Sequence, residues 1–483
     1  MQTTVILFHQ NLRVADNAPL ARAAECGRVV PLFILDEANG RQPGAASRWW
    51  LREALADLQK NLSRLGTSLI LRRGEMITVL RNVLQETGAQ TVAWQRRYEP
   101  ALATHDMGIA EALRKGGTEV FLDDGFLLFD PAAVRTGAGN PFRVFTPFAR
   151  ACFAAAAPTK PIAAPKVLRG VASIASETVD GLNLVPRGAA WTKGLADAWD
   201  VRESAAQDHV AAFVAEGLPH YASDRDRPDR EGTSRLSPYL HFGQISPRQI
   251  WHAVQHQKAA GVAAHTAIER YLLELLWREF SWHLLQQYPE LAEEALNPVF
   301  AHFPWRADQA GMKAWQRGMT GYPIVDAGMR QLWQTGWMHN RVRMVVASFL
   351  IKHLLIDWRV GDAWFWDTLV DADLGANAAS WQWVAGCGAD AAPYFRIFNP
   401  ILQGQKFDPH GDYVRRYVPE LAGLATAYIH APWLAPVDFL AKAGIALGNT
   451  YPKPIVDHSF ARKRALAALA ECKGYGAPER FSP

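Results

Sequence analysis

Residues 4–35, TVILFHQNLRVADNAPLARAAECGRVVPLFIL, decide the fold class of the N-terminal region. Two short apolar runs in this stretch, residues 4–8 and 29–35, have the length and composition of buried β-strands. Three similar runs follow at residues 68–71, 91–94 and 119–122, and amphipathic stretches such as 47–65 and 75–86 lie between them. Strands that alternate with helices favour a parallel sheet. Residues 1–130 are therefore predicted to form a doubly wound five-stranded parallel sheet domain of the α/β class.

The rest of the chain divides into a linker and a helical region. Residues 131–202 include the Ala- and Pro-rich segment AAAAPTKPIAAPK and show little periodicity, which is typical of a long connector. From residue 203 helical patterns take over, at residues 203–216, 247–260, 267–288, 324–334 and 341–357. We expect an all-α domain over residues 203–473 and a short C-terminal tail over residues 474–483.

The composition is that of an ordinary globular protein of 483 residues. Hydrophobic residues make up 49% and charged residues 20%, which excludes a disordered or collagen-like chain. The net charge is only +4, so binding to nucleic acid would require a local basic patch. The cysteines Cys26, Cys152, Cys387 and Cys472 are far apart, which is typical of a reducing compartment and gives no zinc-finger spacing.

Targeting and membrane signals are absent from the sequence. The N-terminus lacks the pattern of a signal peptide, and the longest apolar run, residues 344–351, is too short to cross a bilayer. We therefore expect a soluble, cytoplasmic, monomeric protein without a membrane partner.

Several common enzyme motifs are also missing. The chain has no P-loop, no G-x-G-x-x-G after a strand, no H-E-x-x-H and no G-x-S-x-G. Tryptophan, in contrast, is abundant: twelve of the 18 indoles lie between Trp251 and Trp383. Indoles can simply fill a core, but their clustering in one region requires an explanation.

The segment at residues 224–237, DRDRPDREGTSRLS, alternates arginines with aspartates and ends in a hydroxyl-rich turn. A solvated, self-neutralised loop is the simpler interpretation of this segment. The alternative is a phosphate cradle, because hydroxyl groups and a guanidinium suit a diphosphate.

Three further groups of residues combine polar and aromatic side chains. Glu274, Trp277 and Arg278 recur at helical spacing among leucines. The simpler interpretation is an ion pair between Glu274 and Arg278 on the helix surface. The alternative is a recognition pair, in which the Trp277 indole stacks on a flat ligand and the Glu274 carboxyl group hydrogen-bonds to its edge. Arg341 and Arg343 begin an apolar helix, where the helix dipole prefers acids, which favours a functional partner. Residues 371–377, DADLGAN, hold two close aspartates. Such pairs are more often caps or salt bridges than metal sites, and we predict no bound metal.

Together these segments resemble the photolyase/cryptochrome flavoproteins, and most closely the bacterial cyclobutane pyrimidine dimer photolyases. The resemblance spans essentially the whole chain. It rests on LFHQNLRVADNA (7–18), EGTSRLSPYLHFGQISPR (231–248), TGYPIVDAGMRQL (320–332), NRVRMVVASFLIKHLLIDWR (340–359), DADLGANAASWQW (371–383) and APYFRIFNP (392–400).

The resemblance implies an N-terminal antenna domain, a linker and a C-terminal helical domain that binds FAD. The residues that match the family's phosphate-side flavin contacts are Tyr221, Thr233, Ser234, Arg235, Leu236 and Ser237. On the flavin-ring side the matches are Asp371, Asp373 and Asn377, and Arg343 matches the arginine that pairs with the aspartate at Asp371. The implied reaction is light-driven electron transfer from reduced FAD to a thymine dimer flipped out of DNA.

The resemblance also assigns residues to the lesion and to electron transfer. The lesion pocket and flanking phosphates match Arg225, Glu274, Trp277, Asn340, Arg341, Met344, Trp383 and Gln403. Trp277 and Trp383 would stack on the bases, and a protonated Glu274 would donate to a thymine carbonyl. Trp381, Trp358 and Trp305 match the family's electron-hopping chain.

The antenna chromophore is the least specific part of the resemblance. The chain has Tyr98-Glu99 but lacks the Asn-Glu pair of a common folate pattern. We expect 5,10-methenyltetrahydrofolate, with 8-hydroxydeazaflavin as the alternative.

The alternatives to dimer repair are a (6-4) photolyase, which would place histidines in the lesion pocket, and a cryptochrome-like blue-light photoreceptor, which usually carries a long C-terminal extension. Asn340 and Met344 disfavour the first, and the short predicted tail with Asn377 disfavours the second.

Overall fold

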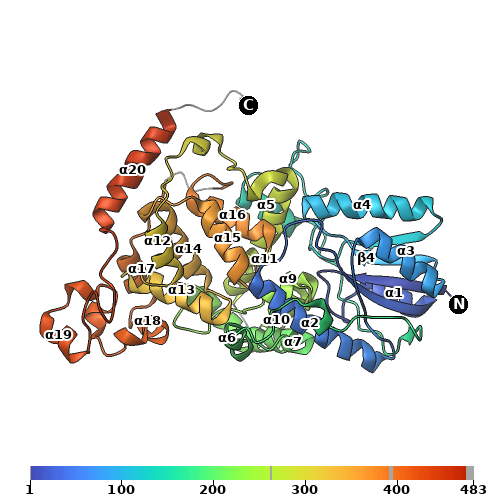
Figure 1. Cartoon of the computed structure of the whole chain (residues 1–483). Helices are drawn as coiled ribbons and strands as arrows, with labels where there is room; N and C mark the ends of the chain where they lie inside the picture. The colour runs from blue at the N-terminus through green and yellow to red at the C-terminus, as the bar shows by residue number, and fades with distance from the viewer. Residues whose placement is uncertain (1, 262–263, 391–394, 475–483) are drawn as a thin grey trace. The chain divides into compact units, whose positions relative to one another are not determined.

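The computed structural model describes residues 2–261, 264–390 and 395–474, and Figure 1 follows the chain through them. The chain forms two compact units, each built from several segments. Unit 1 consists of Met1–Pro219, Ser234–Pro289 and Val370–Asp373. Unit 2 consists of His220–Thr233, Glu290–Leu369 and Leu374–Pro483. These units do not follow the domain limits expected at residues 130 and 202, which remain a prediction, and residues 475–483 of the expected tail lie outside the described residues.

The predicted parallel sheet is present in unit 1. Its main strands are β1 (Gln2–Phe8), β2 (Gly27–Leu35), β3 (Ile70–Arg73), β4 (Thr91–Gln95) and β5 (Glu119–Asp123). They lie in the order β3-β2-β1-β4-β5, and every neighbouring pair is parallel. The strand order therefore reverses between β1 and β4, which is where doubly wound sheets commonly bind a ligand beyond the carboxyl ends of the strands.

Hydrophobic strands and capped helices build the core around this sheet. Val5, Leu7 and Trp94 are fully buried in it. The surrounding helices are α1 (Ala18–Cys26), α2 (Ala45–Leu65), α3 (Met76–Thr87) and α4 (Pro100–Lys115). Asn17 caps α1 by accepting from the Leu20 amide, and α2 ends at Gly66, whose φ of 101° lies in the left-handed region.

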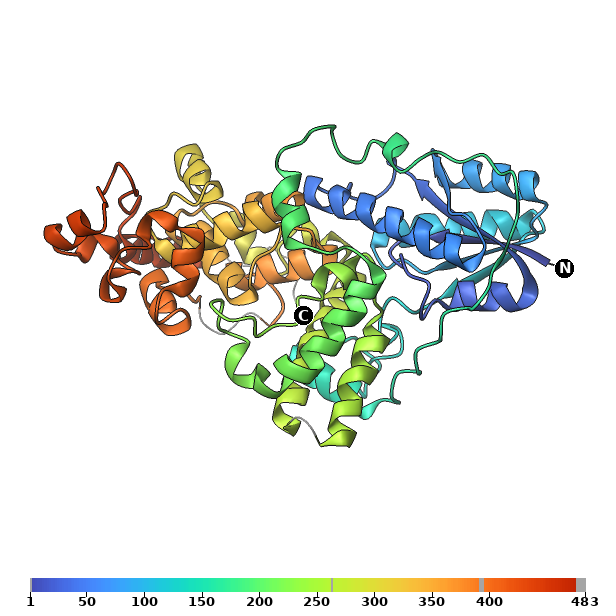
Figure 2. The same ribbon diagram turned by 90° about the horizontal axis from the view of Figure 1, so that it is seen from below.

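The connector, residues 131–202, is more ordered than its composition predicts. It contains α5 (Phe145–Ala154), the two-residue strand β6 (Arg169–Gly170), a 3₁₀ turn at Asp180–Leu182 and α6 (Thr192–Ala198), and Figure 2 shows extended chain over much of the remainder. Strand β6 pairs in parallel with β2, which adds a sixth strand to the sheet. A Cβ at Gly170 would lie 2.7 Å from Thr67 Oγ1, so glycine permits this close approach.

Helices make up the rest of unit 1 and most of unit 2. Unit 1 adds α7 (Glu203–Ala212), a π-turn (Phe213–Gly217), α9 (Ser237–His241), α10 (Pro247–Ala260) and α11 (His265–Gln287). Unit 2 contains α8 (Tyr221–Asp224), α12 (Gln309–Gln316), α13 (Pro323–Thr335), α14 (Asn340–Ser348), a π-turn (Phe349–His353), α15 (Trp358–Thr368), α16 (Leu374–Ala385), α17 (Pro400–Phe407), α18 (Asp412–Tyr417), α19 (Val437–Lys442) and α20 (His458–Gly474), with short 3₁₀ turns between them. The α/β plus all-α fold class is thus confirmed. No described helix is long and apolar enough to span a membrane.

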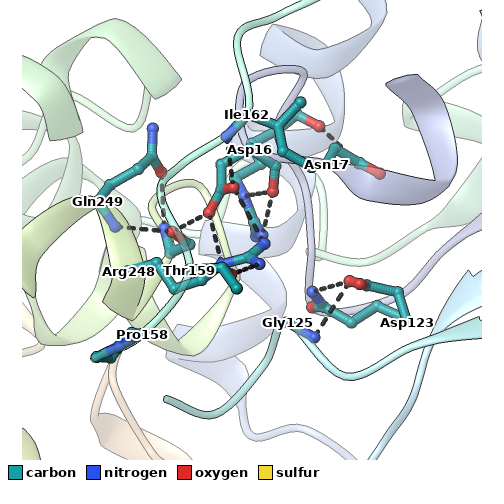
Figure 3. Close-up of polar contacts among 12 residues, drawn as sticks. Asp16, Asn17, Asp123, Gly125, Pro158, Thr159, Ile162, Arg248 and Gln249 are labelled. Carbon is teal, nitrogen blue, oxygen red and sulfur yellow. Dashed lines mark hydrogen bonds and ion pairs between the residues drawn. The ribbon is translucent and has the colours of Figure 1, made fainter. Parts of the chain in front are cut away.

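A buried network anchors the helical part of unit 1 to the loop after β1 (Figure 3). The carboxylate of Asp16, which is fully buried, accepts from the Ser246 hydroxyl, from both Nε and Nη2 of Arg248, and from the Ile162 amide at 2.9 Å. Arg13 donates to the Asp16 carbonyl and to the Gly243 carbonyl. We call these residues the Asp16 network; it joins segments about 230 positions apart in sequence.

Candidate functional site

The turn at residues 234–237 in unit 1 has the backbone of an anion cradle. Arg235 has a φ of +50°, in the left-handed region, and Leu236 follows with a right-handed helical conformation. Consecutive residues of opposite hand direct their backbone N–H groups toward one point, which is the geometry that binds anions. A non-glycine residue at positive φ is costly, so its presence here suggests a ligand-binding purpose.

Polar side chains beside this turn pair across segments that are distant in sequence. Tyr271 on α11 donates to Ser234 Oγ at 3.0 Å, and Ser237 donates to Asp371 Oδ2 at 2.6 Å. The indole of Trp282 donates to Asp373 Oδ2 at 3.0 Å. Both aspartates are buried. Within unit 1, the structure therefore brings the predicted phosphate-side hydroxyls next to the predicted ring-side carboxylates.

Helix α11 carries Glu274 and Trp277. The ring of Trp277 stacks on Phe145, with centroids 3.6 Å apart and planes 9° from parallel. Trp277 and Glu274 are both half-buried. One face of the indole is therefore fixed by the protein, as a base-stacking platform requires.

The buried carboxylate of α11 is Glu279, which the sequence pattern did not single out. Glu279 accepts from the amides of Leu128 and Phe129 and from Arg278 at 3.0 Å. Burial raises the pKa of Glu279 to about 7, against the opposing effect of Arg278. Arg278 is thus paired with its immediate neighbour, and both side chains link α11 to the chain that follows β5.

In unit 2, ion pairs within residues 224–233 partly neutralise this loop of alternating arginines and aspartates, as the simpler interpretation of its sequence predicted. Arg227 pairs with Asp229 and Arg230 with Asp224. A Cβ at Gly232 would lie 2.7 Å from the Cβ of Asp224, so only glycine fits this turn. Arg225 lies 5.6 Å from the ring centroid of Tyr221.

The arginines at the start of α14 find partners that explain their position. Arg341 donates to Asp226 Oδ1 at 2.9 Å, contacts Met344 Sδ at 3.8 Å and lies 4.4 Å from the Phe407 ring centroid. Arg343 Nε donates to the Met338 carbonyl at 2.8 Å. Both arginines remain half-buried, and Asn340 is exposed. A carboxylate and a carbonyl thus offset the unfavourable helix dipole.

Helix α16 places Asn377 and Trp381 one turn apart, as predicted. Asn377 Nδ2 donates to Asp362 Oδ1 at 2.6 Å, and Trp381 packs edge-on against Phe365 at 4.9 Å. A Cβ at Gly361 would lie 2.2 Å from Trp381, so this glycine admits the indole. Neither Gly361 nor Asp362 was singled out from the sequence, since their importance appears only when α15 packs on α16.

The remaining predicted residues of unit 2 lie on separate elements. Trp358 is buried at the start of α15, with Arg359 over its ring at 4.9 Å. Trp305 is half-buried and packs against Phe303 at 4.3 Å. Trp383 on α16 and Gln403 on α17 are half-buried. Residues 392–394 of the quoted APYFRIFNP segment lie outside the described residues.

These donor sets fit a flavin nucleotide better than a metal. The cradle at Arg235 and Leu236 and the hydroxyls of Ser234 and Ser237 suit a diphosphate. Across the described part of the chain, no three histidine, cysteine or acidic side chains form a metal-binding group. The predicted site residues are distributed over the two units, and the contacts described above are those within each unit.

A second polar region follows the carboxyl ends of β1 and β4. Among the described residues, the buried atoms His9 Nε2, Asn11 Nδ2 and Trp94 Nε1 have no hydrogen-bond partner. Burial and the nearby Arg97 lower the pKa of His9 well below its ordinary value, which favours a neutral ring. Unpartnered buried polar atoms at the point where the strand order reverses indicate a ligand site.

Comparisons with known proteins agree with this geometry. Residues 4–166 match the family model described as DNA photolyase, and residues 271–471 match the FAD binding domain of DNA photolyase. The chain is 50% identical to a deoxyribodipyrimidine photo-lyase of Agrobacterium fabrum, over 97% of this chain and 98% of that one. It is 38% identical to cryptochrome-1 of Arabidopsis thaliana, over 97% of this chain and 70% of the plant protein.

A solved structure gives the same result at the level of the fold. The bacterial class III photolyase of Agrobacterium tumefaciens superimposes with a TM-score of 0.95 at 49% sequence identity, covering 98% of each chain. Sequence identity at this level over nearly the full length of both chains leaves a single assignment. The chain belongs to the photolyase/cryptochrome family of flavoproteins.

Proposed function

We propose that this protein is a deoxyribodipyrimidine photo-lyase that repairs cyclobutane pyrimidine dimers in DNA under light. The observation that carries the proposal is the pairing of Ser237 with Asp371 beside the anion cradle, in a chain half identical to a bacterial photo-lyase. When bound, FAD in its fully reduced, photoexcited form supplies the electron that splits the dimer. The protein's own residues bind the cofactor, extrude the dimer and hold its bases.

The flavin contacts are assigned as follows. Thr233, Ser234, Leu236 and Ser237, with the Arg235 backbone and Tyr221, would hold the diphosphate side. Asp371, Asp373 and Asn377 would hold the ring side, and Arg343 would offset the charge of Asp371. The hydroxyl donors and the cradle geometry at residues 233–237 support the first group, and the buried position of the aspartates supports the second.

The lesion would be held by stacking and by a carboxyl group. Trp277, one face of which is stacked on Phe145, would stack its other face on a base, and Trp383 would be the second platform. Glu274, in its protonated form, would donate to a thymine carbonyl as negative charge develops on the base. Asn340, Met344 and Gln403 would complete the pocket.

The strand would be positioned by phosphate contacts at Arg225 and Arg341. Phosphate contacts fix the position of a strand without reading its sequence, which suits a lesion-specific enzyme. The half-buried Arg341, whose partner Asp226 is 37% exposed at its side chain, can exchange that carboxylate for a phosphate.

Trp381, Trp358 and Trp305 would carry electrons between the protein surface and the flavin. The burial of Trp381 and Trp358 and the partial exposure of Trp305 suit an inner-to-outer order. Trp305→Phe tests this role: photoreduction of the flavin should stop, while enzyme reduced chemically beforehand should still repair dimers. Loss of both activities would contradict the hopping role.

We also propose an antenna chromophore in the α/β region, 5,10-methenyltetrahydrofolate, with 8-hydroxydeazaflavin as the alternative. The unpartnered buried atoms of His9 and Asn11, just after β1, and of Trp94, near the end of β4, support a ligand there. The visible spectrum of the purified protein tests this proposal, because either chromophore adds absorption that FAD lacks. We expect the protein to act as a monomer in the cytoplasm.

The experiment for the main proposal uses an oligonucleotide with one thymine dimer. The flavin is reduced, and repair is measured under blue light and in the dark. Light-dependent recovery of the thymines supports dimer repair, whereas bound FAD without repair would favour a cryptochrome-like photoreceptor. Repair of a (6-4) photoproduct instead would overturn the substrate assignment.

A further inference from the structure

Lys352 is a buried lysine of unit 2 that takes part in none of the contacts described so far. It lies in the π-turn Phe349–His353, which continues α14, and such turns inside helices occur frequently at functional sites. The exposed fraction of Lys352 is 0%. Among the residues that the structure describes, no carboxylate forms an ion pair with its amino group. Burying a lysine without a carboxylate partner costs free energy, so its presence here requires a reason.

The amino group of Lys352 contacts a backbone carbonyl and an aromatic ring. Nζ donates to the Ala385 carbonyl at 2.7 Å, and Ala385 is the last residue of α16. Nζ also lies 2.9 Å from the centroid of the Phe395 ring. A Cβ at Gly386 would lie 3.3 Å from Phe395 Cδ2, so glycine permits the ring to approach the helix end. Lys352 therefore caps the carboxyl end of α16 and holds a ring from a later segment.

A second contact from the same helix fastens residues 395–399. Ser348 lies four residues before Lys352, and its hydroxyl accepts from the Phe398 amide at 3.2 Å. Residues 395–399 lead directly into α17. Helix α14 and its π-turn thus bind both the end of α16 and the start of α17, and all of these elements belong to unit 2.

The three helices joined in this way carry the residues of unit 2 that are proposed to hold the dimer. Asn340 and Met344 lie on α14, Trp383 on α16 and Gln403 on α17. Trp383 precedes Ala385 by only two residues, so a displacement of the helix end would displace the proposed stacking platform. A small misplacement of a group that positions a substrate has a large effect on its binding and reaction.

We propose that Lys352 is a positioning residue of the lesion pocket, which holds the end of α16 and the start of α17 against α14 and thereby fixes Trp383 and Gln403 relative to one another. The inference rests on the proposed function and adds to it a buried residue that acts through other side chains. Undamaged DNA is held by phosphate contacts, whereas a dimer that has left the duplex also requires the pocket. Loss of the Lys352 amino group should therefore weaken the binding of a dimer more than the binding of undamaged DNA.

The test measures the dissociation constants of the FAD-loaded protein, in the dark, for an oligonucleotide with one thymine dimer and for the same oligonucleotide without it. Lys352→Met keeps a side chain of similar length but removes the donor. The lesion preference, which is the ratio of the two constants, should fall by about tenfold, the size of one impaired stacking contact. The affinity for undamaged DNA and the flavin spectrum should stay unchanged. Lys352→Arg retains a donor for the carbonyl and should recover part of the preference.

Tyr451→Phe is the matched control for a general loss of stability. Tyr451 is a fully buried residue of unit 2, and its hydroxyl donates to Asp326 Oδ2 at 2.7 Å. Removal of this hydrogen bond should lower the free energy of unfolding and leave the lesion preference unchanged. Urea denaturation measures the stability of both variants. An equal loss of preference in Tyr451→Phe would assign the effect to general stability and overturn the role of Lys352.

The outcomes separate this inference from the proposed function. A wild-type protein without preference for the dimer would contradict the function itself. A wild-type preference that Lys352→Met retains in full would overturn the role of Lys352 and leave the function standing. If Lys352→Met does not fold, Phe395→Leu decides the question, because it removes the ring from the same contact. That variant should also lose preference for the dimer, and an unchanged preference would overturn the inference.

Discussion

Two buried carboxylates of unit 1, Asp16 and Asp371, illustrate the difference between an anchor and a binding site. Each accepts a hydrogen bond from a serine hydroxyl, from Ser246 and Ser237 respectively. Asp16 also accepts from Arg248 and from a backbone amide, so its charge and lone pairs are satisfied within the protein (Figure 3). Within unit 1, the described donor to Asp371 is the Ser237 hydroxyl, and the described donor to the neighbouring Asp373 is the Trp282 indole.

This difference shows how the two sites use buried charge. A carboxylate paired with an arginine inside the protein fixes the fold, because neither group can be removed without exposing the other to an apolar surrounding. Within unit 1, Asp371 and Asp373 accept from a hydroxyl and an indole beside the anion cradle, and this mixed polar and aromatic surrounding suits a ligand site. Burial alone therefore does not identify a functional site, whereas the chemistry of the donors does.

The largest expected loss of stability follows from breaking the Asp16 network. Asp16→Ala leaves the Arg248 guanidinium, whose side chain is 12% exposed, without its carboxylate. We expect the free energy of unfolding to fall by about 3–5 kcal/mol, measured by urea denaturation. Asp180→Ala is the control, since Asp180 is 74% exposed at its side chain and pairs with Arg52 on the surface. Equal losses in both variants would contradict the distinction between the two kinds of pair.

A third buried carboxylate, Glu279, can be tested through the pH dependence of the free energy of unfolding. Its pKa in the folded protein is raised to about 7, above the unfolded value, so the folded state binds the proton more tightly. The stability contributed by that proton is present at low pH and is lost as pH rises from about 4.3 to about 7, by roughly 4 kcal/mol in total. We expect the stability advantage of the wild-type protein over Glu279→Gln to shrink across this range. An advantage independent of pH would contradict the raised pKa.

Substitution of Glu274 tests a carboxylate that is proposed to act in dimer repair and not in folding. Glu274→Ala should reduce dimer repair by about tenfold or more while leaving FAD binding unchanged, because a donor to developing charge matters only in the reaction. Repair by chemically reduced enzyme and the flavin spectrum measure the two effects. Glu269→Ala, an exposed glutamate of the same helix, serves as the control. Unchanged repair would remove Glu274 from the mechanism.

The two serines give the smallest and most direct contrast. Ser237→Ala should weaken FAD binding by about 1 kcal/mol with little change in stability, since it removes one hydrogen bond in the proposed site. Ser246→Ala should lower stability by at least about 1 kcal/mol and leave FAD affinity unchanged, because Ser246 Oγ donates to Asp16 and caps α10 by accepting from the Gln249 amide. FAD titration measures the affinity of both variants, and urea denaturation measures their free energies of unfolding. Equal changes of affinity and of stability in the two variants would contradict the different roles of the two serines.

Much of this organisation was predictable from the sequence. The apolar runs of the first 130 residues produce the five main strands, because short buried runs between amphipathic helices have few other solutions. The spacing of Asn377 and Trp381 places them one turn apart on α16. The hydroxyl-rich turn at residues 233–237 lies where Ser237 meets Asp371.

Other features depend on contacts that local patterns cannot encode. Strand β6 has only the residues Arg169 and Gly170, too few for periodicity, and forms because β2 offers a free edge of backbone there. The sequence pattern of α11 singled out Glu274, yet Glu279 is the carboxylate that is buried. Apolar residues surround α11 on most sides, so the choice of buried face was fixed by the segment at Leu128 and Phe129.

In dimer repair of this kind, the flavin's electron acts catalytically on the dimer. The most direct measurement is a single light flash on chemically reduced enzyme in complex with dimer-containing DNA, with the flavin spectrum recorded before and after. We expect restored thymines and an unchanged spectrum, because the electron returns to the cofactor. Restored thymines with an equal amount of oxidised flavin, or no repair from a complex that retains reduced FAD, would contradict it.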